Sequence, residues 1–245
     1  MFKKSLLFVL FLLSCSQNPV VDSGLNRMVV LAVLSPDFER QTIILYQGIN
    51  QVYTDGLPIG GVDQPIRHAR VVVSSENQVV NFAETAPGEY RDVVIPLFVE
   101  PGKTYFLQVT ASDGQTVQAR TTVPSPVHFL RPEDNLEVTD STFVEFIWTE
   151  SPGVAVCTFD WRRPCEHRNY SRIGDPVHSN RVVVLVLNWS FCDVGPWVHT
   201  FRVSALDSAF ANYVDAFPNG TTNIENGAGV FGSMVSDSLT ITVFP

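Results

Sequence analysis

The feature that most constrains the fold is a strict alternation of apolar and polar residues in short runs. Tyr105, Leu107 and Val109 are apolar at every second position, and the run ends at the turn signal Asp113-Gly114. A period of two is typical of a strand with one buried face. Pro-Gly pairs at 87–88 and 101–102 separate such runs at intervals of about ten residues, as in β-sandwiches. The sequence therefore predicts an all-β domain over residues 25–123.

A second set of strand-like runs follows Pro124-Ser125-Pro126, where two prolines stiffen the chain and cannot join a ladder. This tripeptide predicts a domain boundary, with a second domain over residues 127–245. The run 181–189 is apolar on both faces, which predicts a strand buried in the centre of a sheet. Asp207 is placed to cap a helix over residues 207–217, with an apolar face that begins at Phe210.

The first domain resembles an immunoglobulin-like or carboxypeptidase-regulatory-like β-sandwich, and the second resembles a fibronectin type III-like module. We therefore expect a mainly β fold, made of two tandem immunoglobulin/fibronectin-like β-sandwich modules. One short C-terminal helix would pack on the second module, and the chain would end on a strand.

The first fifteen residues have the three parts of an export signal. Lys3 and Lys4 precede an apolar run over residues 6–13, and the small residue Ser14 comes before Cys15. The run is shorter than the roughly 20 residues that a membrane span needs. Residues 12–15 (LLSC) resemble a bacterial lipobox, whose cysteine carries the lipid. We expect a lipoprotein signal peptide over residues 1–14, lipid attachment (palmitate) at Cys15, and a tether over residues 15–24.

Three further cysteines are expected in the second module: Cys157, Cys165 and Cys192. In an exported chain a disulfide is the first hypothesis, either between Cys157 and Cys165 or between Cys165 and Cys192, and one thiol remains. A metal site that uses these cysteines with His167, His178 or His199 is the alternative. Because no pair has the tight spacing that presents two ligands together, we predict no metal and no cofactor.

A basic and aromatic segment stands out in a chain of net charge −9. Its members are Arg162, Arg163, His167, Arg168, Tyr170 and Arg172. A solvated loop is the simpler interpretation, and a partner-binding loop is the functional one. Beyond Arg162-Arg163 the chain has no Lys/Arg cluster, so the charge pattern predicts no nucleic-acid binding.

No pattern in the chain has the spacing of a catalytic site, so we predict that it is not an enzyme. Gly227, Gly229 and Gly232 spell G-x-G-x-x-G, but thirteen residues follow and they are strand-like, whereas a dinucleotide site needs a helix there. We interpret these glycines as positions of tight turning or close strand approach. The alternatives are a hydrolase hidden in a β fold and a glycan- or nutrient-binding lipoprotein. The latter would stack sugars on Trp161, Tyr170, Trp189 and Trp197.

These pieces together resemble an uncharacterised family of Bacteroidota lipoproteins built around a domain of unknown function. The best marker is the segment 223–232, with the pattern Asn-Ile-x-x-Gly-x-Gly-x-Phe. The resemblance implies a lipoprotein of the cell envelope, anchored to the outer membrane and working beside a partner such as a TonB-dependent receptor. It brings no catalytic residues. Exposure at the cell surface and exposure to the periplasm both stay open.

Overall fold

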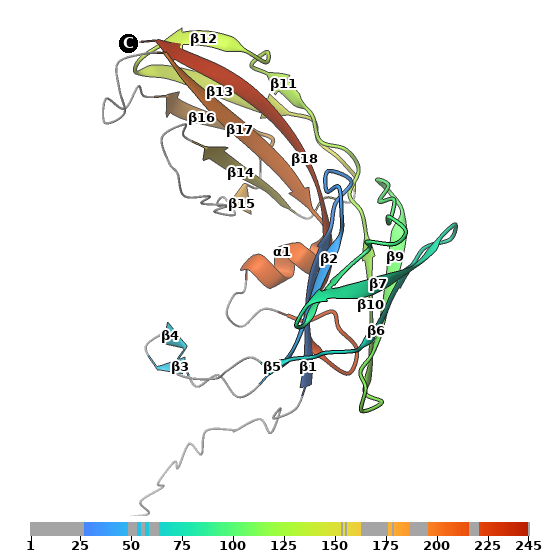
Figure 1. Ribbon diagram of the computed structural model, residues 1–245. Helices are drawn as coiled ribbons and strands as arrows, with labels where there is room; N and C mark the ends of the chain where they lie inside the picture. The colour runs from blue at the N-terminus through green and yellow to red at the C-terminus, as the bar shows by residue number, and fades with distance from the viewer. Residues whose placement is uncertain are drawn as a thin grey trace, which may run out of the picture.

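The computed structural model describes residues 27–48, 53–54, 57–58, 64–152, 154, 156–162, 176–177, 179–186, 196–215 and 221–244. These residues form β-strands almost throughout, and α1 (Ser208–Asp215) is the one helix among them. The expected mainly β fold is thus confirmed. Figure 1 shows two lobes, one above the other, with the long strand β18 (Ala228–Phe244) running through both.

The first lobe is a sandwich of two sheets. One sheet has the order β8-β2-β1-β18, and the other has the order β7-β6-β9-β10, with β7 also pairing with β8. The strands are β1 (Arg27–Leu34), β2 (Thr42–Gly48), β5 (Gln64–Pro65), β6 (Arg70–Ser74), β7 (Val79–Ala86), β8 (Glu89–Arg91), β9 (Thr104–Thr110) and β10 (Thr116–Thr122), beside the small hairpin β3 (Tyr53–Thr54) and β4 (Leu57–Pro58).

The second lobe pairs the rest of β18 with β17 and β12, and β17 continues to β14 and β15. Its other sheet has the order β11-β13-β16. The strands are β11 (Phe129–Arg131), β12 (Leu136–Thr139), β13 (Thr142–Trp148), β14 (Val156–Arg162), β15 (Pro176–Val177), β16 (Arg181–Val186) and β17 (Trp197–Leu206).

Alternating residues fill the two cores, as the period of two predicts. In β9, Tyr105, Leu107 and Val109 are buried in the first core. Phe146 and Phe201 meet in the second core with ring centroids 4.6 Å apart. Burial of each such side chain stabilises the fold by about 1.5–3 kcal/mol, so both cores contribute substantially.

The C-terminal strand belongs to both lobes. Its first half pairs in parallel with β1, from Val29 opposite Ala228 to Leu34 opposite Ser233. Phe231 and Val235 are accordingly buried in the first core, whereas Ile241 lies in the second. The predicted division at residues 124–126 assigned all of this strand to the second module. The structure places residues 224–235 against the first.

The prediction that residues 181–189 form a centrally buried strand is wrong for the part that is described. β16 lies at the edge of its three-stranded sheet. Val182, Val184 and Val186 pack on the core, but Val183 and Leu185 on the other face are exposed. In β16, apolar residues therefore occupy an exposed sheet face as well as the buried one. Residues 187–189 lie outside the described part of the chain.

The helix begins where the sequence predicts. Phe210 N donates to Asp207 Oδ1 at 2.9 Å, which is the side-chain bond of an N-cap. Its position differs from the prediction, because Phe210 packs in a small cluster with Leu31 and Val33 of β1 and Val230 of β18. Those side chains point away from the first core, so the helix covers the outer face of the first lobe and not the second module. Residues 216–217 lie outside the described range.

Nowhere in the described ranges is a helix both long and apolar enough to cross a membrane.

The three glycines of the G-x-G-x-x-G pattern allow the close approach that we expected. A Cβ on Gly227 would lie 2.8 Å from Met28 O, and one on Gly232 would lie 2.5 Å from Phe210 Cβ. Gly229 has a φ of +94°, and its Cβ would lie 2.1 Å from Val30 O. These glycines therefore let residues 227–232 lie close against β1 and α1, and they do not form a nucleotide site.

Replacing Gly229 should break the contact between β1 and β18. In Gly229→Ala the methyl group would collide with Val30 O, and we expect a loss of about 3 kcal/mol or more in unfolding free energy by urea denaturation. Gly102→Ala is the control, because Gly102 also has a positive φ (+76°) but nothing within 4 Å of the added Cβ. It should lose only about 1 kcal/mol. Equal losses in the two variants would contradict the proposed collision.

Candidate binding groove

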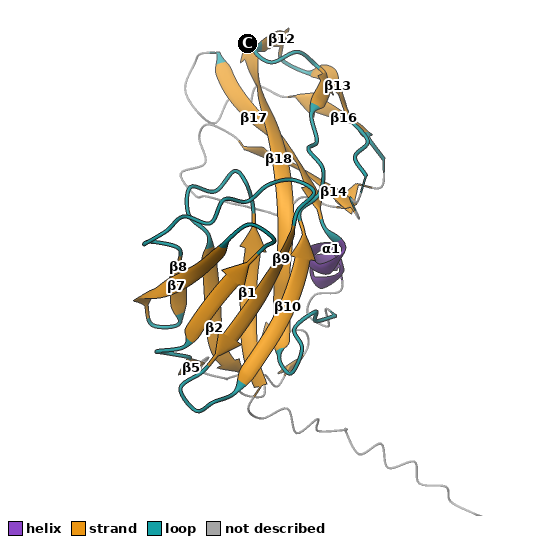
Figure 2. Ribbon diagram, turned by 90° about the vertical axis from the view of Figure 1, so that its right-hand side faces the viewer, coloured by secondary structure: helices purple, strands orange, loops and turns teal. Residues whose placement is uncertain are grey.

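A groove of about 1050 Å³ lies on the outer face of β9 and β10. The first turn of α1 and residues 221–225 form its walls, and Pro124 and Ser125 lie at one end. Figure 2 shows β9, β10 and α1 on one side of the first lobe. Apart from Pro124, Ser125 and Pro152, its lining residues belong to that lobe or to the part of the chain packed on it, so the fold of that lobe largely determines the groove's shape.

The floor is made by outward-facing residues of two antiparallel strands. Thr104 lies opposite Thr122, with 2.8 Å between their hydroxyl oxygens, and Phe106 lies opposite Arg120. Because Tyr105 and Leu107 turn into the core, Phe106 must turn outward, and half of its surface is exposed. The floor is thus polar, with one aromatic face.

The wall at residues 221–225 is fastened to the floor. Glu225 and Gln118 exchange two backbone hydrogen bonds, of which Glu225 N to Gln118 O is 2.7 Å. Asn223 Nδ2 donates to Arg120 O at 3.0 Å and to Phe231 O at 2.8 Å, and its Oδ1 accepts from Phe231 N at 3.0 Å. Asn223 therefore uses its amide to join β10 and β18.

Asp207 is the buried carboxyl group of the groove. Oδ1 accepts hydrogen bonds from Phe210 N at 2.9 Å and from Ser233 N at 3.1 Å. Oδ2 lies 2.6 Å from Thr121 Oγ1, which lies 2.8 Å from Ser233 Oγ. Ser233 Oγ in turn donates to Thr122 O at 3.1 Å. One side chain thus connects α1, β10 and β18.

The hydroxyl groups of this network have one hydrogen too few if Asp207 is ionised. The contacts from Asp207 to Thr121, from Thr121 to Ser233 and from Ser233 to Thr122 O number three, but the two hydroxyls supply two hydrogens. A proton on the carboxyl group would complete the chain. Burial raises the pKa of Asp207, although the hydrogen bonds from Thr121, Phe210 and Ser233 oppose that rise.

The groove continues past Phe106 into a second depression of about 420 Å³. Gly102, Thr104 and Phe106 line both, and the added residues are Ser75, Glu76, Asn77, Glu100 and Lys103. The exposed ring of Phe106 therefore lies midway along a longer polar surface.

Most residues that the sequence singled out lie outside the described part of the chain. These are Cys15, Arg163, Cys165, His167, Arg168, Tyr170, Arg172 and Cys192. Arg162 ends β14, and its side chain is also not described. Cys157 is a half-buried free thiol in β14, and burial raises its pKa. Because Cys157 is free, the predicted alternative of a Cys157–Cys165 disulfide is not formed in the structure, and a disulfide between Cys165 and Cys192 stays a prediction.

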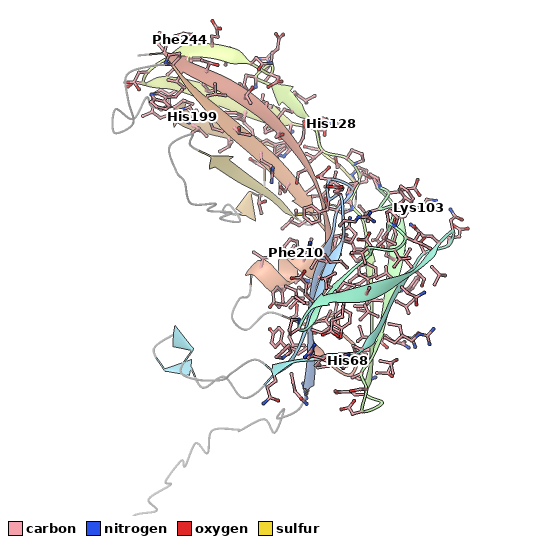
Figure 3. All side chains as sticks on the ribbon, in the orientation of Figure 1. His68, Lys103, His128, His199, Phe210 and Phe244 are labelled. Carbon is pink, nitrogen blue, oxygen red and sulfur yellow. The ribbon has the colours of Figure 1, made fainter. Side chains whose placement is uncertain are left out.

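The residues of the alternative hypotheses are only partly described. Trp197 is half-buried, and the side chains of Trp161, Tyr170 and Trp189 are outside the described set. Figure 3 shows His68 in the first lobe and His128 and His199 in the second. Within the described ranges, no three His, Cys, Asp or Glu side chains are grouped to hold a metal ion.

Sequence reasoning missed the groove, because its floor consists of ordinary outward residues of two strands. The one available signal was Asp207, which the sequence identified only as a helix cap. Nothing in its local sequence indicates that Thr121 and Ser233 lie beside it.

Comparison with solved structures gives low similarity over most of the chain. The fibronectin(III)-like modules of Clostridium thermocellum CbhA are 12% identical with a TM-score of 0.24, over 89% of this chain and 93% of theirs. The FN1-FN3 domains of chicken CNTN1 are 14% identical with a TM-score of 0.25, over 89% of this chain and 69% of theirs. At TM-scores this low, the likeness supports no conclusion about the function of this chain. No curated protein matches the sequence. A family model described as "Domain of unknown function (DUF4249)" matches residues 16–214.

Asp207→Asn should keep the groove folded and change how stability depends on pH. The folded chain binds the Asp207 proton more tightly than the unfolded chain does. Stability should therefore fall as pH rises from the unfolded pKa of about 4 through the raised folded pKa. The asparagine amide can donate to Thr121 at any pH, so this slope should disappear. Urea denaturation at several pH values measures it.

Two further variants complete this test. Asp207→Ala removes the cap and should cost about 1–2 kcal/mol at every pH. Asp113→Asn is the control, because Asp113 is exposed and accepts only from Gln115 N in a turn. If stability depended on pH in Asp207→Asn as it does in the unaltered protein, protonation of Asp207 could not be the cause of that dependence.

Proposed function

We propose that this chain, which belongs to the DUF4249 family of unknown function, is a lipid-anchored binding or accessory module of the bacterial cell envelope. It would be attached to the outer membrane through Cys15 and would support a partner such as a TonB-dependent receptor. The expected membership of an uncharacterised domain family is confirmed. Lipid attachment, location at the outer membrane and the partner are proposed.

The observation that carries the binding role is the groove, whose polar surface presents the half-exposed ring of Phe106. Asp207 lies at this groove, and both of its oxygens are occupied by α1, β10 and β18. It therefore serves the fold and is not free to transfer a proton to a bound molecule. What the groove offers a ligand is a fixed polar surface with one aromatic ring.

The anchor is supported by the sequence before β1. An apolar run, Ser14 and Cys15 form the lipobox-like segment, and the first described strand begins twelve residues after Cys15, at Arg27. Several acyl chains on one cysteine hold a protein firmly, since each buried CH₂ contributes about 0.8 kcal/mol. The net charge of −9 offers no attraction to an anionic bilayer, so the lipid would have to supply the attachment.

Glycan binding is a second candidate, and Phe106 is the observation that favours it. Its half-exposed ring lies midway along the groove beside Arg120 and Thr104, and sugar rings stack on aromatic faces flanked by planar polar groups. The groove's charged residues nearly balance, with Arg120 and Lys103 against Glu76, Glu100 and Glu225. A neutral polysaccharide would suit such a surface.

Lipid attachment is tested by Cys15→Ser in the organism's own cells. The unaltered chain should incorporate an alkyne-labelled palmitate and sediment with the outer membrane, and Cys15→Ser should do neither. Cys157→Ser is the matched control and should behave like the unaltered chain. The labelled protein, purified in mild detergent, should bring a stoichiometric outer-membrane partner with it. Labelling that survives in Cys15→Ser, or a protein that purifies alone, would overturn the proposal in that part.

Glycan binding is tested by affinity electrophoresis in gels that contain xylan or mannan. If the groove binds either, Phe106→Ala should abolish the retardation, because the stacking face is lost. Phe143→Ala should leave it unchanged, since Phe143 is an exposed phenylalanine of the other lobe. Equal retardation of both variants would show that the groove is not the site.

A further inference from the structure

The three-stranded sheet of the second lobe ends in an edge strand. β16 is last in the order β11-β13-β16 and, among the described strands, it pairs only with β13. Asn180 O, just before the strand, accepts from Trp148 N at 3.1 Å. The backbone groups at 182, 184 and 186 are therefore directed towards β13, and those at 181, 183 and 185 are directed away from the sheet.

A neighbouring side chain closes the first of these outward positions. Ser179 Oγ accepts from Arg181 N at 3.3 Å and donates to Arg181 O at 2.7 Å. The backbone N–H and C=O groups of Val183 and Leu185 have no such partner in the described part of the chain. Two donors and two acceptors are therefore open along about 7 Å of strand.

The side chains beside the open backbone groups are apolar and exposed. Val183 is 52% exposed and Leu185 is 37% exposed, both on the outer face of the sheet. Phe143 of β13 lies directly opposite Leu185 and is 71% exposed. The one charge of β16 is on Arg181, which forms an ion pair with Glu145. The edge at residues 182–186 is therefore uncharged.

The first lobe, by contrast, covers the edge of its own outer strand. Glu225 and Gln118 exchange two backbone hydrogen bonds beside β10, and Asn223 donates to Arg120 O. Proteins shield exposed edges in this way, or with charged residues and prolines, because an open edge pairs readily with other strands. Residues 182–186 contain no charge and no proline, and no described strand covers them. This edge is therefore suited to pairing with another chain.

We propose that β16 binds an extended segment of a protein partner, which joins the sheet as a fourth strand. The inference rests on the proposed function, because it names the surface that would hold the partner. An extended backbone matches alternating donors and acceptors at this spacing, and its main-chain hydrogen bonds supply the affinity. Its side chains beside Val183 and Leu185 would be apolar and uncharged, because cross-strand neighbours on one face contact each other.

A second copy of this chain is the less suitable occupant. β16 runs away from the first lobe, since it starts at the linker end of β13 and ends beside Thr142, at the far end of the second lobe (Figure 1). A twofold axis that gives both copies a common sheet face makes their edge strands antiparallel. The two first lobes would then point in opposite directions, and the lipids proposed at Cys15 would lie at opposite ends of the dimer.

Site-specific photocrosslinking in the organism's own membranes tests the proposal. The full lipid-bearing chain carries p-benzoylphenylalanine in place of Leu185, or in place of Phe98 as the matched control. Phe98 is 70% exposed and belongs to the first lobe. We expect one protein adduct from position 185, at least about tenfold stronger than any from position 98. The crosslinked partner peptide, sequenced by mass spectrometry, should be uncharged and apolar at alternate positions.

Three variants separate the backbone hydrogen bonds from the side chains. Val183→Pro removes an N–H that β13 does not use, which an edge strand tolerates, so it should lower the co-purified partner at least about tenfold with thermal unfolding nearly unchanged. Val183→Thr keeps the N–H and the branched shape and should retain the partner. Leu185→Lys is the second disruptive variant, because a lysine on an edge strand opposes strand addition.

Amide exchange provides a direct measurement of the pairing. When the unaltered protein binds a synthetic peptide of the crosslinked sequence, the N–H groups of Val183 and Leu185 should exchange at least about tenfold more slowly, and the already paired N–H of Val184 should change little. An adduct to lipid or to a second copy, or equal adducts at both positions, would overturn the proposal. If a partner co-purifies but ignores Val183→Pro and Leu185→Lys, only the edge is wrong; if none co-purifies, the proposed function fails with it.

Discussion

The parallel pairing of β18 with β1 is the contact on which the rest of the structure depends. A strand of seventeen residues is about 55 Å long, which is enough to run through two sandwiches. One half of β18 completes a sheet of the first lobe, and the other half lies between β17 and β12 in the second. The pairing is possible because Gly229 has no side chain where Val30 O passes. The first lobe consequently lacks a strand until the end of the chain is present.

Two buried aspartates organise the two surfaces that face outward. Asp207 binds the start of α1 and Ser233 N, and so forms one wall of the groove. Asp92 binds Gln41 N and Leu97 N, and so fixes the loop after β8 in which Val94 and Ile95 are exposed. Loss of these donors would leave a buried carboxyl group unsatisfied and would destabilise the fold by roughly several kcal/mol, so the residues that donate to it have little freedom to move. In both places, polar burial gives a loop or a helix end a definite position.

Local periodicity was enough to predict the strands and the helix cap, and it could not predict how they pair. The alternation around Leu107 and the position of Asp207 are properties of neighbouring residues, and both predictions were confirmed. The pairing of Val30 with Gly229 joins positions almost two hundred residues apart, and no local pattern carries it. The exposure of the loop after β8 could not be predicted for a related reason, because apolar residues such as Val94 and Ile95 suggest a core until their exposure is known. The same ambiguity misled the interpretation of β16, since Val183 is exposed although its strand is apolar throughout.

The direction of β1 determines which lobe a lipid at Cys15 would hold near the membrane. β1 begins at Arg27, at the end of the first lobe that lies away from the second lobe, as Figure 1 shows. Twelve residues from Cys15 to Asn26 can span at most about 40 Å. A lipid at Cys15 would therefore keep the first lobe near the membrane, and the second lobe would be free to project away from it.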